Sequence, residues 1–399
     1  MHIAWFRETP PNAADPRDET AALIAELRSR HAIDVFTEAD AHDFVWRHVL
    51  TPWDLCVYEL DNTDASQFAW AYLLNYPGVV YLKSRTLHDS RAAALDREGR
   101  IDEYVTEFRF NHQANPPFTW KGQHHTARRT WPVLLASRSV VVPHATVAQS
   151  LQEEYPEARV RYAPAGSSGS VGADLQVRPY NTCRFGLLDL NRVDVVERAL
   201  HRARAAGAAI DLMKGESIDR VLAECDVVIA LTWPTFDAPL TAALAGMAAG
   251  KPVITFELQT TADWPALDPQ TWRPRGIATA EAPIAVTIDP RDEEHSLMLA
   301  MRRLASDAAL REQLGGAARA WWRAHATPAH AAAAWNQILE EAVSLAPPPR
   351  PAGWPTHLSA DGTELADSIL REFGLKATLF NHETTKAGFK PPTRTPARS

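Results

Sequence analysis

The sequence predicts an α/β protein with two doubly wound domains, each a parallel sheet covered by helices and facing a shared cleft. Short apolar runs alternate with stretches of helical periodicity along most of the chain, the pattern that a parallel sheet with crossover helices requires. The 399 residues are 46% hydrophobic and 23% charged, which is enough to bury more than one core. We therefore expect ligands to bind at the carboxyl ends of the strands, where open α/β sheets bind them.

The first domain is predicted over residues 1–165. Apolar runs predict strands at 3–6, 33–36, 54–60, 78–82, 139–142 and 159–163. Helical spacing of apolar residues predicts helices at 21–30, 64–74, 87–95, 101–111 and 146–155. Within these helices, Leu23, Ile24 and Leu27 share one face, and the four-residue spacing of Tyr104, Phe108 and His112 indicates a packed face.

A Gly- and Ser-rich stretch predicts a hinge at 166–178, and the second domain is predicted over 179–345. Its strands are predicted at 183–188, 209–213, 226–230 and 252–256, and its helices at 192–205, 218–224, around 240–247 and within the Ala-rich stretch 291–345. Trp321 and Trp322 are expected to pack between the domains. The short connection between Met213 and Ile218 has no room for a further strand and helix.

The composition changes in residues 346–399, a Pro-rich C-terminal extension. The string APPPRPAGWP favours an extended spacer, and a short amphipathic helix is predicted at 361–373. The end carries Lys386, Lys390, Arg394 and Arg398 with no acidic residue after Thr384. We expect a solvated tail, with docking of a protein partner as the alternative.

Charge and motifs exclude several functions. Lys and Arg total 41 against 49 Asp and Glu, a net charge of -8, which offers no general field for nucleic acid. Three scattered cysteines, Cys56, Cys183 and Cys225, have neither disulfide nor zinc spacing, so we expect buried thiols and no metal site. No signal sequence or membrane span is predicted, which indicates a cytoplasmic protein or one held peripherally at the inner membrane face. GxSxG, HExxH and Walker A strings do not occur.

The most informative segment is LTWPTFDAPLTAALAGMAAGKPVITFE, residues 231–257. A strand is followed by a loop with Thr235 and Asp237, and then by a helix with Pro239 in its first turn. Free backbone N–H groups at such a helix start attract anions. By local features alone, Asp237 also fits a simple N-cap and Gly250 a simple C-cap turn.

This segment resembles the donor site of the family 4 retaining glycosyltransferases of GT-B fold, with their acidic residue, helix and AMAAGKPVI string. RFGLLDLNRVDVVERAL (184–200) is similar to the family's first strand and helix of the donor domain, which hold the donor pyrophosphate. DLCVYELDNTDASQFAWAYLLNYPGVVYL (54–82) is similar to its acceptor-domain stretch, and the resemblance spans about residues 3–335. It implies GT-B architecture with two Rossmann-like domains.

On the acceptor side, the resemblance places Lys83 where the family has its catalytic-region His, with His88 five residues further on. The Gly-rich turn of the family after the first strand is here NAADPRDE (12–19), without glycine. Lys83 and His88 are therefore the expected catalytic residues.

On the donor side, Gly186 and Arg192 are expected at the phosphates, and Thr235 and Asp237 near the sugar and ribose. Leu187 and Asn191 replace the family's Arg and Lys at the leaving group, and Ala245 replaces its second Glu. Lys214 and Lys251 are further candidate cations.

The activity that the resemblance implies is metal-independent sugar transfer, with retention, from a nucleotide-sugar donor to an acceptor, without a further cofactor. Two alternatives stay open. One is a catalytically inactive glycosyltransferase-like binding or scaffold protein, and the other a GT-B nucleotide-sugar epimerase.

Overall fold

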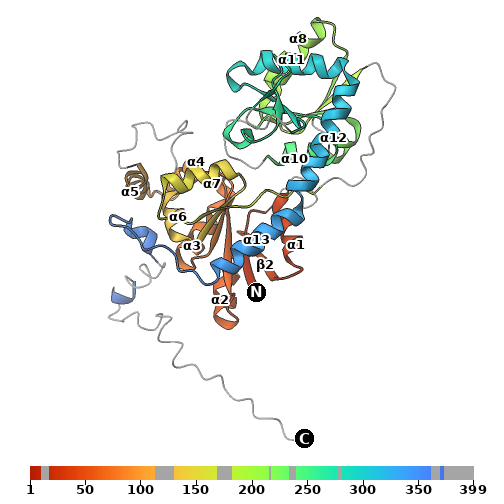
Figure 1. Ribbon diagram of the computed structural model, residues 1–399. Helices are drawn as coiled ribbons and strands as arrows, with labels where there is room; N and C mark the ends of the chain where they lie inside the picture. Colours follow the sequence, from red (N-terminus) through yellow and green to blue (C-terminus); the bar gives the residue numbers. More distant parts are fainter. Residues whose placement is uncertain are drawn as a thin grey trace, which may run out of the picture. The chain divides into compact units, whose positions relative to one another are not determined.

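The computed structural model describes residues 1–9, 18–112, 130–168, 182–214, 217–232, 240–275, 281–360 and 369–372. Residues 1–350 form one compact unit and residues 351–399 a second. The first unit contains two β-sheets flanked by helices (Figure 1). The predicted α/β class with parallel sheets is therefore confirmed.

The N-terminal sheet has six parallel strands in the order β2-β1-β3-β4-β5-β6. β3 and β4 are buried along their whole length, because both faces of a parallel sheet are covered. All six strands predicted for this half are present: β1 (His2–Phe6), β2 (Ala32–Phe36), β3 (Leu55–Leu60), β4 (Val79–Leu82), β5 (Ser139–Val142) and β6 (Val160–Tyr162).

Helices connect these strands: α1 (Glu19–Leu27), α2 (His42–Leu50), η1 (Asp64–Ser66), α3 (Phe68–Asn75), α4 (His88–Arg97), α5 (Ile101–His112), α6 (Trp131–Ala136) and α7 (Ala145–Glu154). The α2 and α6 helices were not predicted. In α2 the apolar side chains lie on more than one face, since Phe44 is buried whereas Trp46 and Leu50 are exposed, so the sequence has no clean helical periodicity. On α5, Tyr104 and Phe108 are buried in one cluster as expected.

The last helix of the Ala-rich stretch, α13 (Pro328–Ala342), completes the N-terminal core. Its Trp335 ring centroid lies 5.2 Å from Trp5 and 5.3 Å from Tyr81, and Figure 1 shows α13 beside α1. At the end of α13, Arg138 donates to the Val343 carbonyl at 3.0 Å. A segment distant in sequence therefore covers one face of the first sheet.

The C-terminal sheet has the order β12-β11-β13-β10-β9-β7-β8, and only the β11–β12 pair is antiparallel among the described strands. The four predicted strands are present as β7 (Cys183–Leu187), β8 (Ile210–Met213), β9 (Val227–Ile229) and β10 (Val253–Phe256). β11 (Ala266–Leu267), β12 (Pro274–Arg275) and β13 (Ala285–Ile288) were not predicted. They are short and are not separated by long helices, so the alternating pattern is lost. β8 is an edge strand, and the chain passes from it to the next helix without a further strand.

Two helical layers cover this sheet. Core residues of α8 (Val193–Ala205) and α11 (Glu293–Ser306) share one cluster. Those of α9 (Ile218–Glu224), α10 (Thr241–Ala248) and α12 (Ala308–His325) share the other. Trp321 and Trp322 pack against this second cluster, and their expected place between the domains stays a prediction.

The three cysteines are free and buried. Burial raises the pKa of Cys56 to about 11 and those of Cys183 and Cys225 to about 12. They are therefore unreactive thiols at neutral pH.

Among the described residues, we find no helix long and apolar enough to cross a bilayer.

In the second unit, the described part contains the short helix η5 (Thr356–Ser359), with Leu358 buried. Most of the helix predicted at 361–373 lies outside the described residues, and 369–372 are helical.

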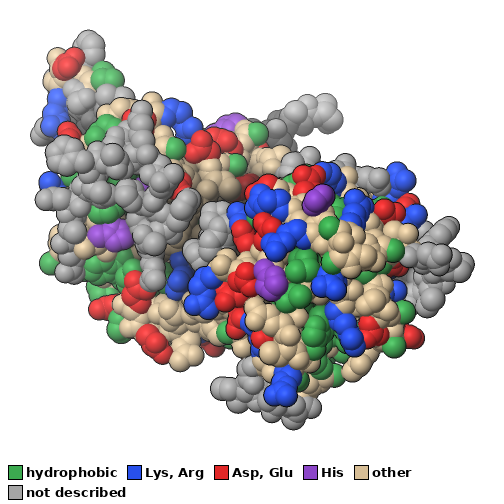
Figure 2. Space-filling view, turned by 90° about the horizontal axis from the view of Figure 1, so that it is seen from above, with side chains coloured by type: hydrophobic (Ala, Val, Ile, Leu, Met, Phe, Trp, Pro, Cys, Tyr) green, Lys and Arg blue, Asp and Glu red, His purple; other side chains and the backbone are tan. Residues whose placement is uncertain are grey.

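On the face of the molecule that Figure 2 presents, acidic and basic side chains are interspersed. The expected lack of a nucleic-acid partner stays a prediction.

Candidate functional site

Charged side chains gather where β1, β3 and β4 of the N-terminal sheet end and α1 begins. We call Arg7, Asp18, Glu19, Glu59 and Lys83 the N-terminal ion cluster. Arg7 directly follows β1, Glu59 lies near the end of β3, Lys83 directly follows β4, and Asp18 and Glu19 start α1. Parallel strands place their carboxyl ends at one edge of a sheet, which is why residues distant in sequence meet here.

Lys83 lies between two buried carboxylates. Its Nζ is 3.1 Å from Oε1 of Glu19 and contacts Oε1 of Glu59. Burial lowers the pKa of Lys83, but Glu19 and Glu59 outweigh this and raise the pKa well above its ordinary value. Lys83 is therefore a fixed positive charge at neutral pH, which suits electrostatic stabilisation and does not suit a general base or a nucleophile.

Arg7 extends the cluster on the other side of Glu59. Its Nη2 donates to Oδ1 of Asp18 at 2.8 Å, and its Nε lies 3.7 Å from Oε2 of Glu59. Oδ1 of Asp18 also accepts the Ala21 N–H at 2.9 Å and so caps α1. The second oxygen of each carboxylate, Oδ2 of Asp18 and Oε2 of Glu59, is buried without a hydrogen-bond partner in the described part of the chain.

Two more carboxylates, Glu8 and Asp61, form the rim of the cluster, and both are only partly buried. Burial raises the pKa of Glu8, a hydrogen bond from Thr63 opposes the shift, and the Asp61 charge adds to it. Burial also raises the pKa of Asp61, against the Asn62 backbone N–H and Lys83. The edge of the N-terminal sheet is therefore acidic despite its two cations.

His88, the second predicted catalytic residue, is buried at the start of α4, with 1% of its surface exposed. Its Nε2 lies 3.1 Å from the Tyr104 hydroxyl and its Nδ1 3.2 Å from Oδ1 of Asp89. Both ring nitrogens are thus engaged by neighbouring side chains. The catalytic role of His88 stays a prediction.

Gly186 lies inside β7, paired with Met213 and Val228. A Cβ at this position would lie 2.5 Å from Cγ1 of Val221 and 3.0 Å from Cβ of Cys225. Close packing of α9 on β7 therefore requires glycine here, whatever the residue does for a phosphate.

Arg192 precedes α8, and its guanidinium forms an ion pair with Glu293 at the start of α11. The two side chains are 22% and 23% exposed. Thr235 and Asp237 lie outside the described residues. Of the four predicted donor-side residues, the structure therefore describes only Gly186 and Arg192. Gly186 lies inside β7, and Arg192 lies at the start of α8.

The replacements at the family's donor positions are buried, since Leu187 and Ala245 are 2% and 1% exposed. Arg275 is another cation of this half that is already paired. Arg275 contacts Glu257 and lies 3.1 Å from Asp268.

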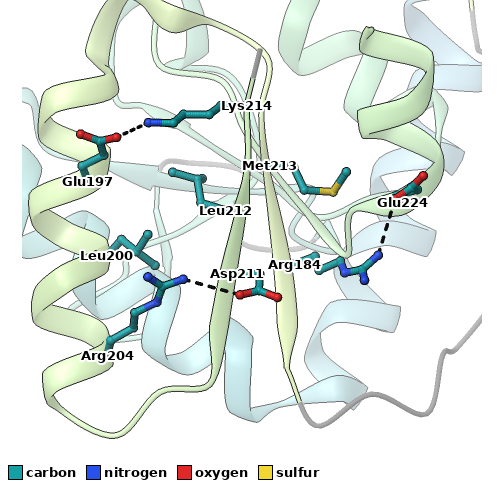
Figure 3. A pocket seen from close by; sticks show the side chains of 9 residues that line it. All are labelled: Arg184, Glu197, Leu200, Arg204, Asp211, Leu212, Met213, Lys214 and Glu224. Atoms are coloured by element: carbon teal, nitrogen blue, oxygen red, sulfur yellow. Dashed lines mark hydrogen bonds and ion pairs between the residues drawn. The ribbon is translucent and has the colours of Figure 1, made fainter. Parts of the chain in front are cut away.

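A surface pocket of about 400 Å³ runs along the edge strand β8 (Figure 3). Three ion pairs line it: Lys214 with Glu197, Arg204 with Asp211 and Arg184 with Glu224. Arg204 also donates two hydrogen bonds, of 2.9 and 2.7 Å, to the Ile210 carbonyl. The charges of this pocket are balanced, and Arg204 covers part of the strand edge. We therefore interpret these charged side chains as protecting the edge strand from pairing with another strand.

In the described residues, no group of three or more His, Cys, Asp or Glu side chains is arranged to hold a metal ion. The expectations of no metal and no cofactor stay predictions.

No protein-family model and no curated protein sequence matches this chain. A sucrose-phosphate synthase structure from Thermosynechococcus elongatus aligns with 85% of this chain and 98% of its own, at 12% identity and a TM-score of 0.58. Anabaena HepE, solved with UDP and glucose, aligns with 86% of this chain and 100% of its own, at 11% identity and a TM-score of 0.47. The fold is of the GT-B type.

Sequence reasoning found Lys83 but missed the carboxylates around it. Glu59 lies in an apolar strand, and Glu19 follows a charged stretch that reads as an ordinary helix start. Glu59 itself indicates the cluster, because a charged residue in a strand that is buried on both faces is rarely unpaired.

Proposed function

We propose that this protein is a glycosyltransferase of the family 4 type, moving a sugar from a nucleotide-sugar donor to an acceptor, without a metal ion and with retention of configuration. The observation that carries the proposal is the GT-B fold, to which the resemblance of residues 54–82, 184–200 and 231–257 to family 4 adds.

The proposed chemistry needs positive charge near the departing diphosphate and room for the acceptor on the opposite side. Negative charge develops on the diphosphate while the sugar gains oxocarbenium character. In this proposal Gly186, Arg192, Thr235 and Asp237 serve the donor, and Lys83 and His88 serve the reacting centre. Arg192 would bind the diphosphate in competition with Glu293, its present partner.

The inactive binding protein remains the second candidate for one reason. Leu187 and Ala245 are buried and apolar, so they supply neither charge nor hydrogen bonds to a donor. A single experiment separates the two candidates.

The experiment is a thermal-shift titration of the full chain with UDP, GDP, ADP and their sugar conjugates. A ligand that binds only the native state stabilises it by RT ln(1 + [L]/Kd), about 2.7 kcal/mol at a hundredfold excess over Kd. We expect one nucleotide to raise the melting temperature, and the same nucleotide sugar to be consumed on incubation.

Arg192→Ala should abolish the shift, and Arg291→Ala is the matched control. Arg291 lies near the same helix start, but its side chain is 90% exposed and pairs only with Asp289 among the described residues. A cooperative melting transition that no nucleotide moves would refute the transferase proposal and favour the binding protein.

A further inference from the structure

The start of α8 carries an arginine whose hydrogen-bond donors are only partly used. Arg192 is the N-cap residue of this 13-residue helix. Its Nη2 donates to Oε1 of Glu293, whereas its Nε is buried and has no hydrogen-bond partner in the described part of the protein. A guanidinium has five N–H donors in a planar fork. The single carboxylate oxygen at Nη2 therefore leaves a buried donor unsatisfied, which costs free energy.

Glu293 is held opposite Arg192 by the packing of two helices. α8 and α11 lie side by side and bury core residues in one cluster (Figure 1). Glu294, the next residue on α11, accepts hydrogen bonds from Arg198 and Arg202 of α8 at 2.9 and 3.0 Å. These contacts fix the start of α11 against α8. Glu293 therefore leaves Arg192 by rotation of its own side chain and not by movement of the helix.

A phosphate group satisfies the guanidinium more completely than this carboxylate does. Its terminal oxygens can accept from Nη2 and Nε together, in the bidentate geometry that arginine adopts with phosphate. Negative charge is also favoured at a helix N-terminus. Asp194, the acidic residue in the first turn of α8, pairs with Arg198 at 3.0 Å. Among the described carboxylates, Glu293 is therefore the one that a phosphate at Arg192 displaces.

We propose that Glu293 is a built-in competitor for the diphosphate of the donor. It occupies Arg192 in the free protein and so lowers the affinity of the site for the donor and for the nucleoside diphosphate product. This inference rests on the proposed function, which assigns Arg192 to the diphosphate. Binding exchanges one partner of Arg192 for another and leaves the displaced carboxylate close to a second negative charge. The competition therefore favours release of the nucleoside diphosphate after transfer.

The test compares Glu293→Gln with the wild-type full chain by calorimetry at pH 7 and low salt. The ligands are inorganic pyrophosphate, UDP, GDP and ADP. Glutamine keeps the size of the side chain and removes its charge. We expect the Kd of the ligand that binds to fall about fivefold, the range that a partly exposed ion pair allows. Glu293→Ala, which removes the amide oxygen as well, should lower the Kd at least as much.

Glu294→Gln is the matched control, because it removes the same charge from the next position on α11. Its carboxylate binds Arg198 and Arg202 and not Arg192, so the Kd should change less than about twofold. The ratio between the Kd values of the wild type and Glu293→Gln should also shrink as salt rises, since screening weakens a competing charge. A gain caused by altered packing would not respond to salt in this way.

Each other outcome overturns a distinguishable statement. Nucleotide binding that Arg192→Ala abolishes and Glu293→Gln leaves unchanged would overturn the competitor and leave the transferase standing. Equal gains in Glu293→Gln and Glu294→Gln would also overturn the competitor, because the effect would then be one of net charge. Pyrophosphate binding that Glu293→Gln strengthens, in a protein that no nucleotide stabilises, would overturn the assignment of the site to a nucleotide-sugar donor. Binding of none of these ligands to any variant would overturn both proposals.

Discussion

The carboxyl edges of the two sheets both carry ion pairs, but the charged side chains are buried to different extents at the two edges. At the N-terminal sheet, Lys83 and Arg7 are buried between carboxylates, with side chains 16% and 10% exposed. At the C-terminal sheet, Arg192 and Glu293 form a pair whose side chains are 22% and 23% exposed, and Glu257 beside Arg275 is 49% exposed. Both edges follow from parallel strands ending together, so the contrast comes from burial and not from topology.

The contrast teaches which edge depends on its ion pairs. A buried pair must compensate two desolvated charges, so removing one partner leaves the other uncompensated. A pair near the surface is screened by water and contributes about 0–1 kcal/mol. The N-terminal edge should therefore be sensitive in stability, whereas the C-terminal edge can exchange its partners for a ligand at low cost.

Removing the central cation tests the N-terminal edge most severely. Lys83→Met leaves Glu19 and Glu59 buried without their cation, and we expect a loss of about 3–5 kcal/mol in the free energy of unfolding. Urea denaturation followed by circular dichroism measures it. Adding Glu19→Gln to Lys83→Met should restore part of the loss, and a double variant no more stable than Lys83→Met would contradict the charge argument.

Adding a methyl group at Gly186 tests whether the C-terminal edge depends on close packing and not on its ion pairs. Gly186→Ala places a Cβ against Val221 and Cys225, and overpacking of this kind costs about 1–3 kcal/mol. The control is Gly316→Ala in α12, where a Cβ would meet no heavy atom within 4 Å. Because alanine is the better helix former, the control should gain about 0.5–1 kcal/mol. Equal effects of both changes in thermal denaturation would refute the packing role of Gly186.

The rim of the N-terminal edge should respond to pH. The pKa of Asp61 is raised above its ordinary value of 3.8 chiefly by burial, so the folded state binds the proton more tightly and loses stability as pH rises through that range. Asp61→Asn should therefore raise the melting temperature at pH 7, and the gain should disappear as pH falls toward 4. A gain that is the same at pH 4 and pH 7 would show that ionisation is not its cause.

Breaking the Arg192–Glu293 pair of the C-terminal edge should change the free energy of unfolding least. Arg192→Ala should lower the free energy of unfolding by about 1 kcal/mol or less, while the nucleotide-induced shift in melting temperature disappears. The same chemical denaturation series serves as the measurement. A loss as large as that of Lys83→Met would abolish the distinction between the two edges.

The sequence predicted most of the regular structure of both sheets. Strands with continuous apolar runs, such as Val79–Leu82 and Val253–Phe256, were found because burial on both faces leaves a clear pattern. The α2 helix was missed because its apolar residues Trp46 and Leu50 lie in solvent. The short strands after Phe256 were missed because two to four residues give no periodicity.

The candidate site was predicted less completely. Lys83 was found because it directly follows a recognisable strand, at the position where the resemblance to the family 4 glycosyltransferases predicts a catalytic residue. Glu19, Glu59 and Arg7 were not found, since each is an ordinary charged residue locally. Each gains its meaning from a partner on another element, Lys83 for Glu19 and Glu59, and Glu59 for Arg7.

Local sequence alone therefore determined the alternation of strands and helices, the α/β class and the buried cysteines. These features depend on hydrophobic periodicity and on residue type within a window of a few residues. The tertiary structure decided that α13 covers the N-terminal core, that Gly186 serves packing, and that Lys83 is fixed between two carboxylates. Those facts depend on contacts between distant segments, because burial and Coulomb interactions are set by distances in space.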